Sequence, residues 1–177
     1  INGAGRVTSS SNINISTEVQ GKLTTNINLK KGTEFSENQI LFKIKDSDAR
    51  LLLIARKSNY LNLISNSLPD LKIDFTNSFE KWESFFNSIK VNSALPEFPN
   101  FSTNKEKNFI VSRSILSEYY SIKSEEERLK KYIITAPFNG SILEAFTDEG
   151  AIVNPGSPII NIIRKGDMEI EIPINPL

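Results

Sequence analysis

The segment Ala136-Pro-Phe-Asn-Gly140, which is followed by Gly150-Ala-Ile-Val-Asn-Pro-Gly156, carries the strongest fold signal in the chain. Its glycines and prolines mark turns, because glycine tolerates backbone angles that other residues avoid and proline lacks the amide hydrogen of a strand ladder. Short apolar runs lie between and after these turns, namely Ile142-Leu143, Ile152-Val153 and Ile159-Ile160. The pattern predicts short antiparallel β-strands connected by tight turns.

The spacing of this segment recurs near the start of the chain. Apolar residues follow Gly150 at three, nine and twelve positions, and they follow Gly32 at the same three distances. An earlier glycine precedes each half, Gly21 by eleven residues and Gly140 by ten. The extra residue predicts a β-bulge in the first half. The six apolar residues of the repeat are Phe35, Leu41, Ile44, Val153, Ile159 and Ile162.

Each half has one apolar face and too few strands to cover it. We therefore expect the two halves to complete one small sandwich, with the intervening residues leaving and returning at the same edge. The alternative is a pair of unrelated β-hairpins that share common turn residues. In the first interpretation, the structural turns of the two halves lie at Gly21, Gly32, Pro137, Gly140, Gly150, Pro155 and Gly156.

A helical pattern begins after Asp46-Ser-Asp48, where aspartate and serine favour a helix start. The following residues predict a helix that packs against one partner helix, because apolar residues recur at spacings of seven, three and four: Ile54, Leu61, Ile64 and Leu68. Pro69 is expected to end this helix, since proline removes a helical hydrogen bond.

A second helix is predicted from Thr103-Asn-Lys-Glu106, which has the form of a capping box, to about Lys131. Apolar residues repeat at seven along it: Ile115, Ile122 and Leu129. Together the two helices predict an antiparallel hairpin over residues 47–131, with an irregular middle segment at residues 69–104.

The middle segment contains an aromatic row, Phe79, Trp82 and Phe86, on a short predicted helix. Two interpretations remain open for this row. It is an interaction surface, or it is a local core that the extended residues 90–104 cover as a strap. The spacing of three and seven is typical of a packed helix face.

Composition excludes several classes of function. The chain has 177 residues, a formal net charge of zero and no histidine or cysteine. Cys- and His-based catalysis, zinc sites with imidazole or thiolate ligands, and disulfide bonds are therefore excluded. The 21 basic and 21 acidic residues form no basic cluster, so nucleic acid is not an expected partner. We expect no enzymatic activity, no catalytic residues, no cofactor and no metal site.

The chain is expected to be part of a longer protein. No apolar stretch reaches the ~20 residues that a membrane helix needs. The alternating sequence Met168-Glu-Ile-Glu-Ile-Pro-Ile174 predicts a strand that needs partners. Residues 166–177 are therefore interpreted as the start of a further β domain.

The glycine-containing motifs resemble those of a known family. In the first half they are Gly21-Lys-Leu, Leu29-Lys-Lys-Gly32 and Ile40-Leu-Phe-Lys-Ile-Lys-Asp46, and in the second the pattern is Ala-Pro-Phe-x-Gly followed by Gly-x-x-Val-x-x-Gly. These motifs resemble the periplasmic adaptor family of bacterial tripartite efflux pumps, also called membrane fusion or hemolysin-D-like proteins.

The resemblance implies an α+β fold that is mainly β. A lipoyl-like β-sandwich, or barrel-sandwich hybrid, is split between residues 6–46 and 132–165. An antiparallel helical hairpin is inserted over residues 47–131, in a variant that resembles hairpins of adaptors from the Bacteroidetes group. Residues 166–177 then begin an adjoining β-barrel domain.

The resemblance also implies a non-enzymatic role in the periplasm, with attachment to the inner membrane through a segment missing from this chain. An adaptor links an inner-membrane transporter, often of the resistance-nodulation-division type, to an outer-membrane channel protein. Neighbouring adaptor copies form a ring. Adaptors of ATP-driven type I export systems share these modules, so that role is the nearest alternative.

The predicted hairpin departs from the family pattern in two ways. Its first helix has only about twenty residues, or about 30 Å. The Arg-Leu-x-x-Leu pattern of many hairpin tips is missing, since Lys57 follows Arg56. A carrier domain of a biotin- or lipoyl-dependent enzyme is an alternative of another class. Lys43 and Lys45 lie near the junction of the halves, but a carrier lysine needs a tight exposed turn.

Overall fold

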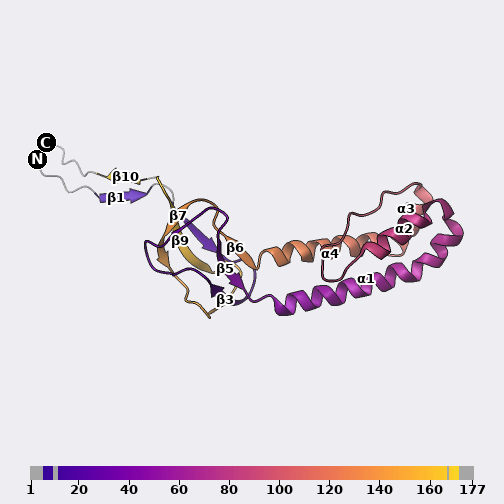
Figure 1. The fold of residues 1–177 in the computed structure, drawn as a ribbon, viewed down its shortest axis with the longest axis horizontal. Coiled ribbons are helices and arrows are strands. Elements are labelled where there is room, and N and C mark those ends of the chain that lie inside the picture. Colours follow the sequence, from indigo (N-terminus) through magenta and orange to yellow (C-terminus); the bar gives the residue numbers. More distant parts are fainter. Residues whose placement is uncertain (1–5, 10–11, 167, 172–177) are drawn as a thin grey trace, which may run out of the picture. The chain divides into compact units, whose positions relative to one another are not determined.

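The computed structural model describes residues 6–9, 12–166 and 168–171. The chain divides into two compact units, residues 1–45 with residues 131–177, and residues 46–130. The first unit consists of β-strands and the second of α-helices (Figure 1). The expected mixed fold with antiparallel sheets is therefore confirmed.

The described strands form three antiparallel sheets. β2, β9, β7 and β4 form one four-stranded sheet, β6, β5, β3 and β8 form the other, and β1 pairs with β10. The strand bounds are β1 Arg6–Ser9, β2 Asn12–Ser16, β3 Gly21–Thr25, β4 Glu34–Phe35, β5 Ile40–Ile44, β6 Ile133–Thr135, β7 Gly140–Ala145, β8 Ile152–Val153, β9 Pro158–Arg164 and β10 Met168–Glu171.

Each four-stranded sheet takes two strands from each half of the chain. β4 of the first half pairs with β7 of the second, and β8 of the second half pairs with β3 of the first. The exchange makes the two sheets equivalent by a pseudo-two-fold relation. The predicted interlocking of the two halves is confirmed, and the alternative of two unrelated hairpins is wrong.

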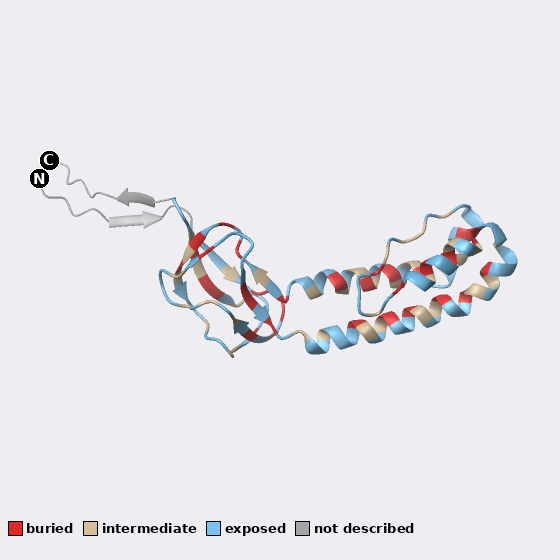
Figure 2. Ribbon diagram, in the orientation of Figure 1, coloured by how far each residue is buried: buried red, intermediate tan, exposed pale blue. Residues whose placement is uncertain are grey.

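The repeat positions are the core of this unit. All six apolar residues of the repeat are at most 5% exposed: Phe35, Leu41, Ile44, Val153, Ile159 and Ile162. Figure 2 shows buried segments along the strands of this unit. The repeat also extends to the turns, because Gly32 N–H donates to the Ile142 carbonyl at 2.7 Å and Gly150 N–H donates to the Leu23 carbonyl at 2.9 Å.

The predicted bulge between Gly21 and Gly32 does not occur where it was expected. The register of strand pairing shifts instead between Ile15 and Ser16, between Ile40 and Phe42, and between Ile142 and Glu144.

The second unit contains four helices in its described residues: α1 Ser47–Asp74, α2 Thr76–Ser88, α3 Asn104–Ser112 and α4 Ile115–Lys130. The prediction that Pro69 ends the first helix is wrong, because α1 continues for five residues beyond it. Pro69 and Ser65 are both exposed, so the Ser65 carbonyl that loses its helical donor faces water. Figure 1 shows that α1 curves towards its C-terminal end, as a proline-containing helix does.

The buried seam of α1 also differs from the predicted one. Ile64 belongs to it, but Ile54, Leu61 and Leu68 are only partly buried. The seam contains two polar residues, Lys57 and Ser67. A prediction that places only apolar residues in the core therefore misses them. The buried residues follow spacings of four and three: Leu53, Lys57, Tyr60, Ile64, Ser67 and Leu71.

The predicted second helix is two helices. Ser114 has φ of 58°, a left-handed conformation that interrupts the helix between α3 and α4. Ile115 and Ile122 are buried as expected, whereas Leu129 is partly buried. The predicted cap is present, because the Thr103 side chain accepts a hydrogen bond from Glu106 N–H at 3.1 Å.

The predicted start of a further β domain falls partly within the structure. β10 pairs with β1 in a separate two-stranded sheet. Residues 167 and 172–177 of that segment lie outside the described residues.

Candidate functional site

The aromatic row on α2 lies under the extended residues 89–103, hereafter the strap. Trp82 is fully buried, and its ring lies 5.5 Å from the Phe98 ring of the strap. Phe98 in turn lies 4.8 Å from Tyr119 of α4, so the strap joins two helices. Trp82 therefore cannot belong to an exposed interaction surface. Phe79 and Phe86 are partly buried and pack against the same core.

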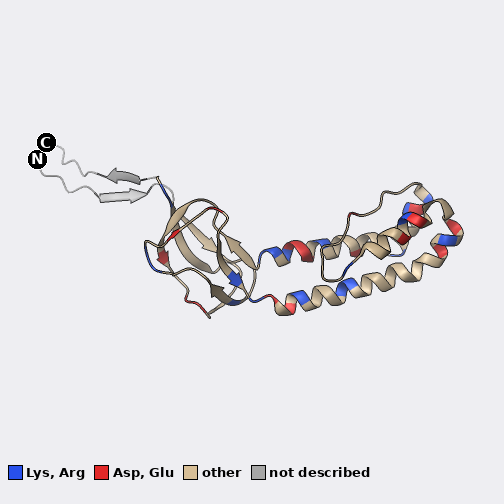
Figure 3. Ribbon diagram, in the orientation of Figure 1, with Lys and Arg blue, Asp and Glu red and all other residues tan. Residues whose placement is uncertain are grey.

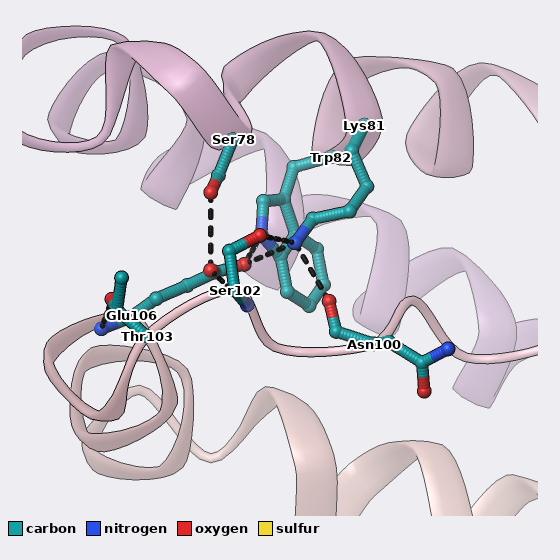
Figure 4. A network of polar contacts seen from close by, with 7 residues as sticks. All are labelled: Ser78, Lys81, Trp82, Asn100, Ser102, Thr103 and Glu106. Carbon is teal, nitrogen blue, oxygen red and sulfur yellow. Dashed lines mark hydrogen bonds and ion pairs between the residues drawn. The ribbon is translucent and has the colours of Figure 1, made fainter.

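The far end of the strap is fixed by Glu106, whose side chain is fully buried. Figure 4 shows its polar contacts. Its two oxygens accept hydrogen bonds from four donors. Lys81 Nζ lies at 2.6 Å, Trp82 Nε1 at 2.7 Å, the Ser102 backbone N–H at 2.8 Å and Ser78 Oγ at 3.0 Å. Lys81 also donates to the Asn100 carbonyl and the Ser102 hydroxyl.

The environment of Glu106 changes the pKa of its carboxyl group. Burial alone raises the pKa of a carboxyl group, because it penalises the charged form. The hydrogen bonds from Lys81, Trp82, Ser102 and Ser78 outweigh burial and lower the pKa of Glu106 to about 2. The carboxylate is thus charged at neutral pH and serves as a structural acceptor.

The near end of the strap is fixed by a second buried ion pair. Lys57 Nζ of α1 lies 2.6 Å from Glu126 Oε1 of α4, and the two side chains are 3% and 9% exposed. Lys57 also donates to the Ser93 carbonyl, and Glu126 Oε1 accepts from Leu95 N–H at 2.8 Å. Burial raises the pKa of Glu126, but Lys57, Leu95 N–H and Lys123 lower it further than burial raises it.

These two ion pairs explain why buried charges occur in the helical unit. Each pair joins two parts of the unit and holds one end of the strap through backbone atoms. Ser78 and Lys81, whose spacing matches a catalytic Ser-x-x-Lys pattern, both donate to Glu106 and so have a structural role. Sequence reasoning missed both pairs, since their members are far apart in the chain.

The helices meet at a surface that we call the hairpin tip, residues 70–77 and 105–114. Arg113 Nη2 lies 2.6 Å from Asp70 Oδ2, and the Phe75 and Phe109 rings lie 5.2 Å apart. Ile73 and Val111 remain 78% and 48% exposed there.

Two of the predicted turn glycines begin strands. Gly21 is the first residue of β3 and Gly140 the first of β7. A Cβ atom at Gly140 would lie 2.2 Å from the Ile163 carbonyl oxygen, and one at Gly21 would lie 2.6 Å from Ile44 Cγ2. Both positions need glycine because neighbouring atoms approach the backbone closely.

The other predicted turn residues lie between strands. Gly32, Gly150 and Gly156 have φ between 85° and 88°, which favours glycine. Pro137 lies between β6 and β7, and Pro155 lies between β8 and β9. These residues position strands and offer no reactive group.

Lys43 and Lys45, the lysines considered for a carrier function, lie at or just after the end of β5, before the helical segment begins. β5 and β6 pair directly, and Ile44 N–H donates to the Tyr132 carbonyl at 2.8 Å. Lys43 lies within β5 opposite Ile133, and Lys45 N–H donates to the Lys22 carbonyl. Residues 46–130 take the place of the short turn that a modified lysine needs.

The described residues offer neither a metal site nor a membrane-spanning helix. No group of acidic side chains among them has an arrangement that holds a metal ion. No described helix combines the length and the apolar character of a membrane span.

The fold has relatives among solved structures. A MacA–MexA chimera with the Pseudomonas aeruginosa MexA α-hairpin domain has a TM-score of 0.63 and 16% identity, over 97% of this chain and 53% of the chimera. A proposed efflux transporter from Bacteroides eggerthii has a TM-score of 0.58 and 16% identity, over 95% of this chain and 44% of that one. MacA from Actinobacillus actinomycetemcomitans has a TM-score of 0.51 and 19% identity, over 94% of this chain and 53% of MacA.

No protein-family model and no curated protein matches the sequence. At sequence identities of 16–19%, the structural likeness shows the fold alone. The described residues have the fold of membrane fusion proteins, the periplasmic adaptors, as the sequence motifs predict. The chain spans about half the length of these solved structures.

Proposed function

We propose that the chain is part of a non-enzymatic periplasmic adaptor that links an inner-membrane efflux transporter to an outer-membrane channel. The observation that carries the proposal is the position of the helical insertion. Residues 46–130 follow β5 and precede its direct neighbour β6, so the helical segment is inserted between two paired strands of an interlocked β unit. Solved structures of this fold include proteins described as efflux components.

In this proposal, residues 6–46 and 132–165 form a lipoyl-like sandwich and residues 166–177 begin a β-barrel domain. The pseudo-two-fold exchange of β4 and β8 supports the lipoyl-like assignment, because each half covers the other's apolar face. The structural turns then serve to hold the two ends of the hairpin together. The protein is attached to the inner membrane by another segment of the full-length protein.

The hairpin tip is the proposed contact with the channel. Ile73 and Val111 are its most exposed apolar residues among those described, and Asp70 with Arg113 fixes their two helices. Neighbouring adaptor copies are proposed to form a ring. An adaptor of an ATP-driven exporter uses the same parts, and the genes that accompany this one distinguish the two pump classes.

Photocrosslinking in the bacterium that encodes the full-length protein tests the proposal. Benzoylphenylalanine in place of Ile73 is expected to give a covalent product with an outer-membrane channel. Leu52 is a matched control position, since it is 72% exposed on the same helix but lies in the first turns of α1. It should give no channel product. A full-length protein found in the cytoplasm, or Ile73 products that lack any envelope protein, would contradict the adaptor role.

A further inference from the structure

A cleft of the helical unit has no part in the proposed function. It measures about 520 Å³ and lies between the first turns of α1, the last turns of α4 and the loop at residues 91–94. This volume is within the range of ~300–1,000 Å³ that small-molecule sites occupy. Its occupant can be inferred from the chemistry of its walls, independently of the adaptor role.

One wall of the cleft is apolar. Leu53 and Ile54 of α1, Leu129 of α4 and Val91 of the loop all line it. Leu53 is buried, and the other three are partly buried, so they leave an apolar strip beside the opening. A strip of this kind favours a hydrocarbon group, because its burial removes apolar surface from water.

The polar wall contains a buried ammonium group that has one more N–H donor than the acceptors described around it. Lys57 Nζ has three donors, and in the described part of the chain it meets two acceptors, the Ser93 carbonyl and Glu126. Its side chain is 3% exposed and lines the cleft. A ligand that brings an acceptor to this position satisfies the remaining donor.

The charge of the lining favours an anion. Four basic residues and two acidic ones line the cleft. Arg50 pairs with Asp46, and Lys130 pairs with Glu127. Lys57 and Lys123 therefore share Glu126 and leave one positive charge in excess. Glu126, one of the two acidic residues, already forms an ion pair with Lys57 and accepts a hydrogen bond from the Leu95 N–H. Lys123 Nζ lies 3.4 Å from Glu126 Oε2 and is partly exposed at the cleft. Figure 3 shows both basic and acidic residues in the C-terminal half of α4.

We propose that this cleft binds an anionic amphiphile, with a carboxylate or phosphate head against Lys57 and Lys123 and a hydrocarbon chain along Leu53, Ile54 and Leu129. The apolar strip and the excess of basic groups lie in one cleft, which is the combination that such a molecule requires. A purely polar anion leaves the strip empty, and an amphiphilic cation meets the wrong charge.

Calorimetric titration of the 177-residue chain tests this proposal with four probes below their micelle-forming concentrations. Decanoate and decyl phosphate are expected to bind with one-to-one stoichiometry, and the stronger of the two identifies the head group. Acetate, which has the anionic head without the chain, and decyltrimethylammonium, which has the chain on a cationic head, should bind at least tenfold more weakly.

Three variants locate the site. Lys123→Gln should weaken decanoate binding at least fivefold, and Lys107→Gln, a matched change on the exposed surface of α3, should leave it unchanged. Ala94→Trp, at an exposed loop position of the cleft, should block binding while circular dichroism shows a folded protein. Equal effects of the two glutamine variants, binding by a folded Ala94→Trp protein, equal affinity for acetate, or no decanoate binding would each overturn the proposal.

Discussion

Glu106 makes the stability of the helical unit depend on pH. Its pKa is about 2 in the folded protein and 4.5 in the unfolded chain. Because the folded pKa is the lower one, the stabilisation is fully present above about pH 4.5 and is lost as the pH falls towards 2. At ~1.4 kcal/mol per pH unit, it amounts to roughly 3 kcal/mol.

Glu106→Gln should therefore lower the unfolding free energy by about 3 kcal/mol at pH 7, because Lys81 loses its partner inside the unit. The variant should also lose this part of the acid dependence. Urea denaturation between about pH 2 and pH 7 measures both effects. Glu80→Gln, on the exposed face of the same helix α2, should change stability by no more than about 0.5 kcal/mol. Parallel pH curves for Glu106→Gln and the wild type would contradict the assignment.

The pseudo-two-fold relation makes a prediction about turn residues. Asn38 lies six residues after Gly32, and Gly156 lies six residues after Gly150, so the two positions correspond. Both have a positive φ, which is 63° at Asn38 and 85° at Gly156. Asparagine tolerates this conformation better than other residues. Gly156→Asn should therefore be nearly neutral, whereas Gly156→Val should cost about 1–2 kcal/mol in thermal unfolding experiments. Equal losses would show that the two turns are not equivalent.

Close approach gives a larger effect than turn conformation. Gly140→Ala places a methyl group within van der Waals overlap of the Ile163 carbonyl oxygen, and backbone cannot move away cheaply. At Gly32 no atom lies within 4 Å of an added Cβ, so only the left-handed backbone is penalised. We expect Gly140→Ala to unfold at a clearly lower temperature than Gly32→Ala. The reverse order would contradict the packing around β7.

At the scale of elements, the strap depends on the buried Lys57–Glu126 pair. Lys57→Met leaves Glu126 buried without its main partner and should cost about 3 kcal/mol. The double variant Lys57→Met/Glu126→Leu should recover much of that loss, since two apolar side chains replace two charges. Limited proteolysis by trypsin at the exposed Lys90 measures strap release directly. Cleavage should be fastest in the single variant, and equal rates in all three proteins would contradict the clamp.

Elements that depend on local sequence signals could be predicted, whereas those that depend on distant partners, such as the Lys57–Glu126 pair, could not. β-strands and their turns follow from glycine, proline and apolar spacing, all of which are local signals, and the repeat positions are buried as expected. The α1 seam could not be found in this way, because Lys57 and Ser67 occupy core positions. The burial of Lys57 depends on Glu126, which is distant in sequence, and Ser67 donates to the Leu63 carbonyl one helical turn earlier. Ser114 likewise gives no local signal for the break between α3 and α4.

At the scale of the whole molecule, the two units should fold independently, because each has its own core. Ile44 and Tyr132 are joined by a hydrogen bond, and β5 and β6 are antiparallel neighbours. A two-residue Asn-Gly turn fits such a pair of strands. Replacing residues 46–130 by Asn-Gly should therefore give a folded β protein, with dispersed amide signals in its NMR spectrum.

Residues 46–130 expressed alone should be helical by circular dichroism and should unfold cooperatively, since both ion pairs and the strap lie inside this segment. Glu106→Gln should destabilise this segment as much as it destabilises the full chain. A segment that folds only when joined to the β unit would contradict the division into two cores. It would also show that the β unit does more than hold the two ends of the hairpin together.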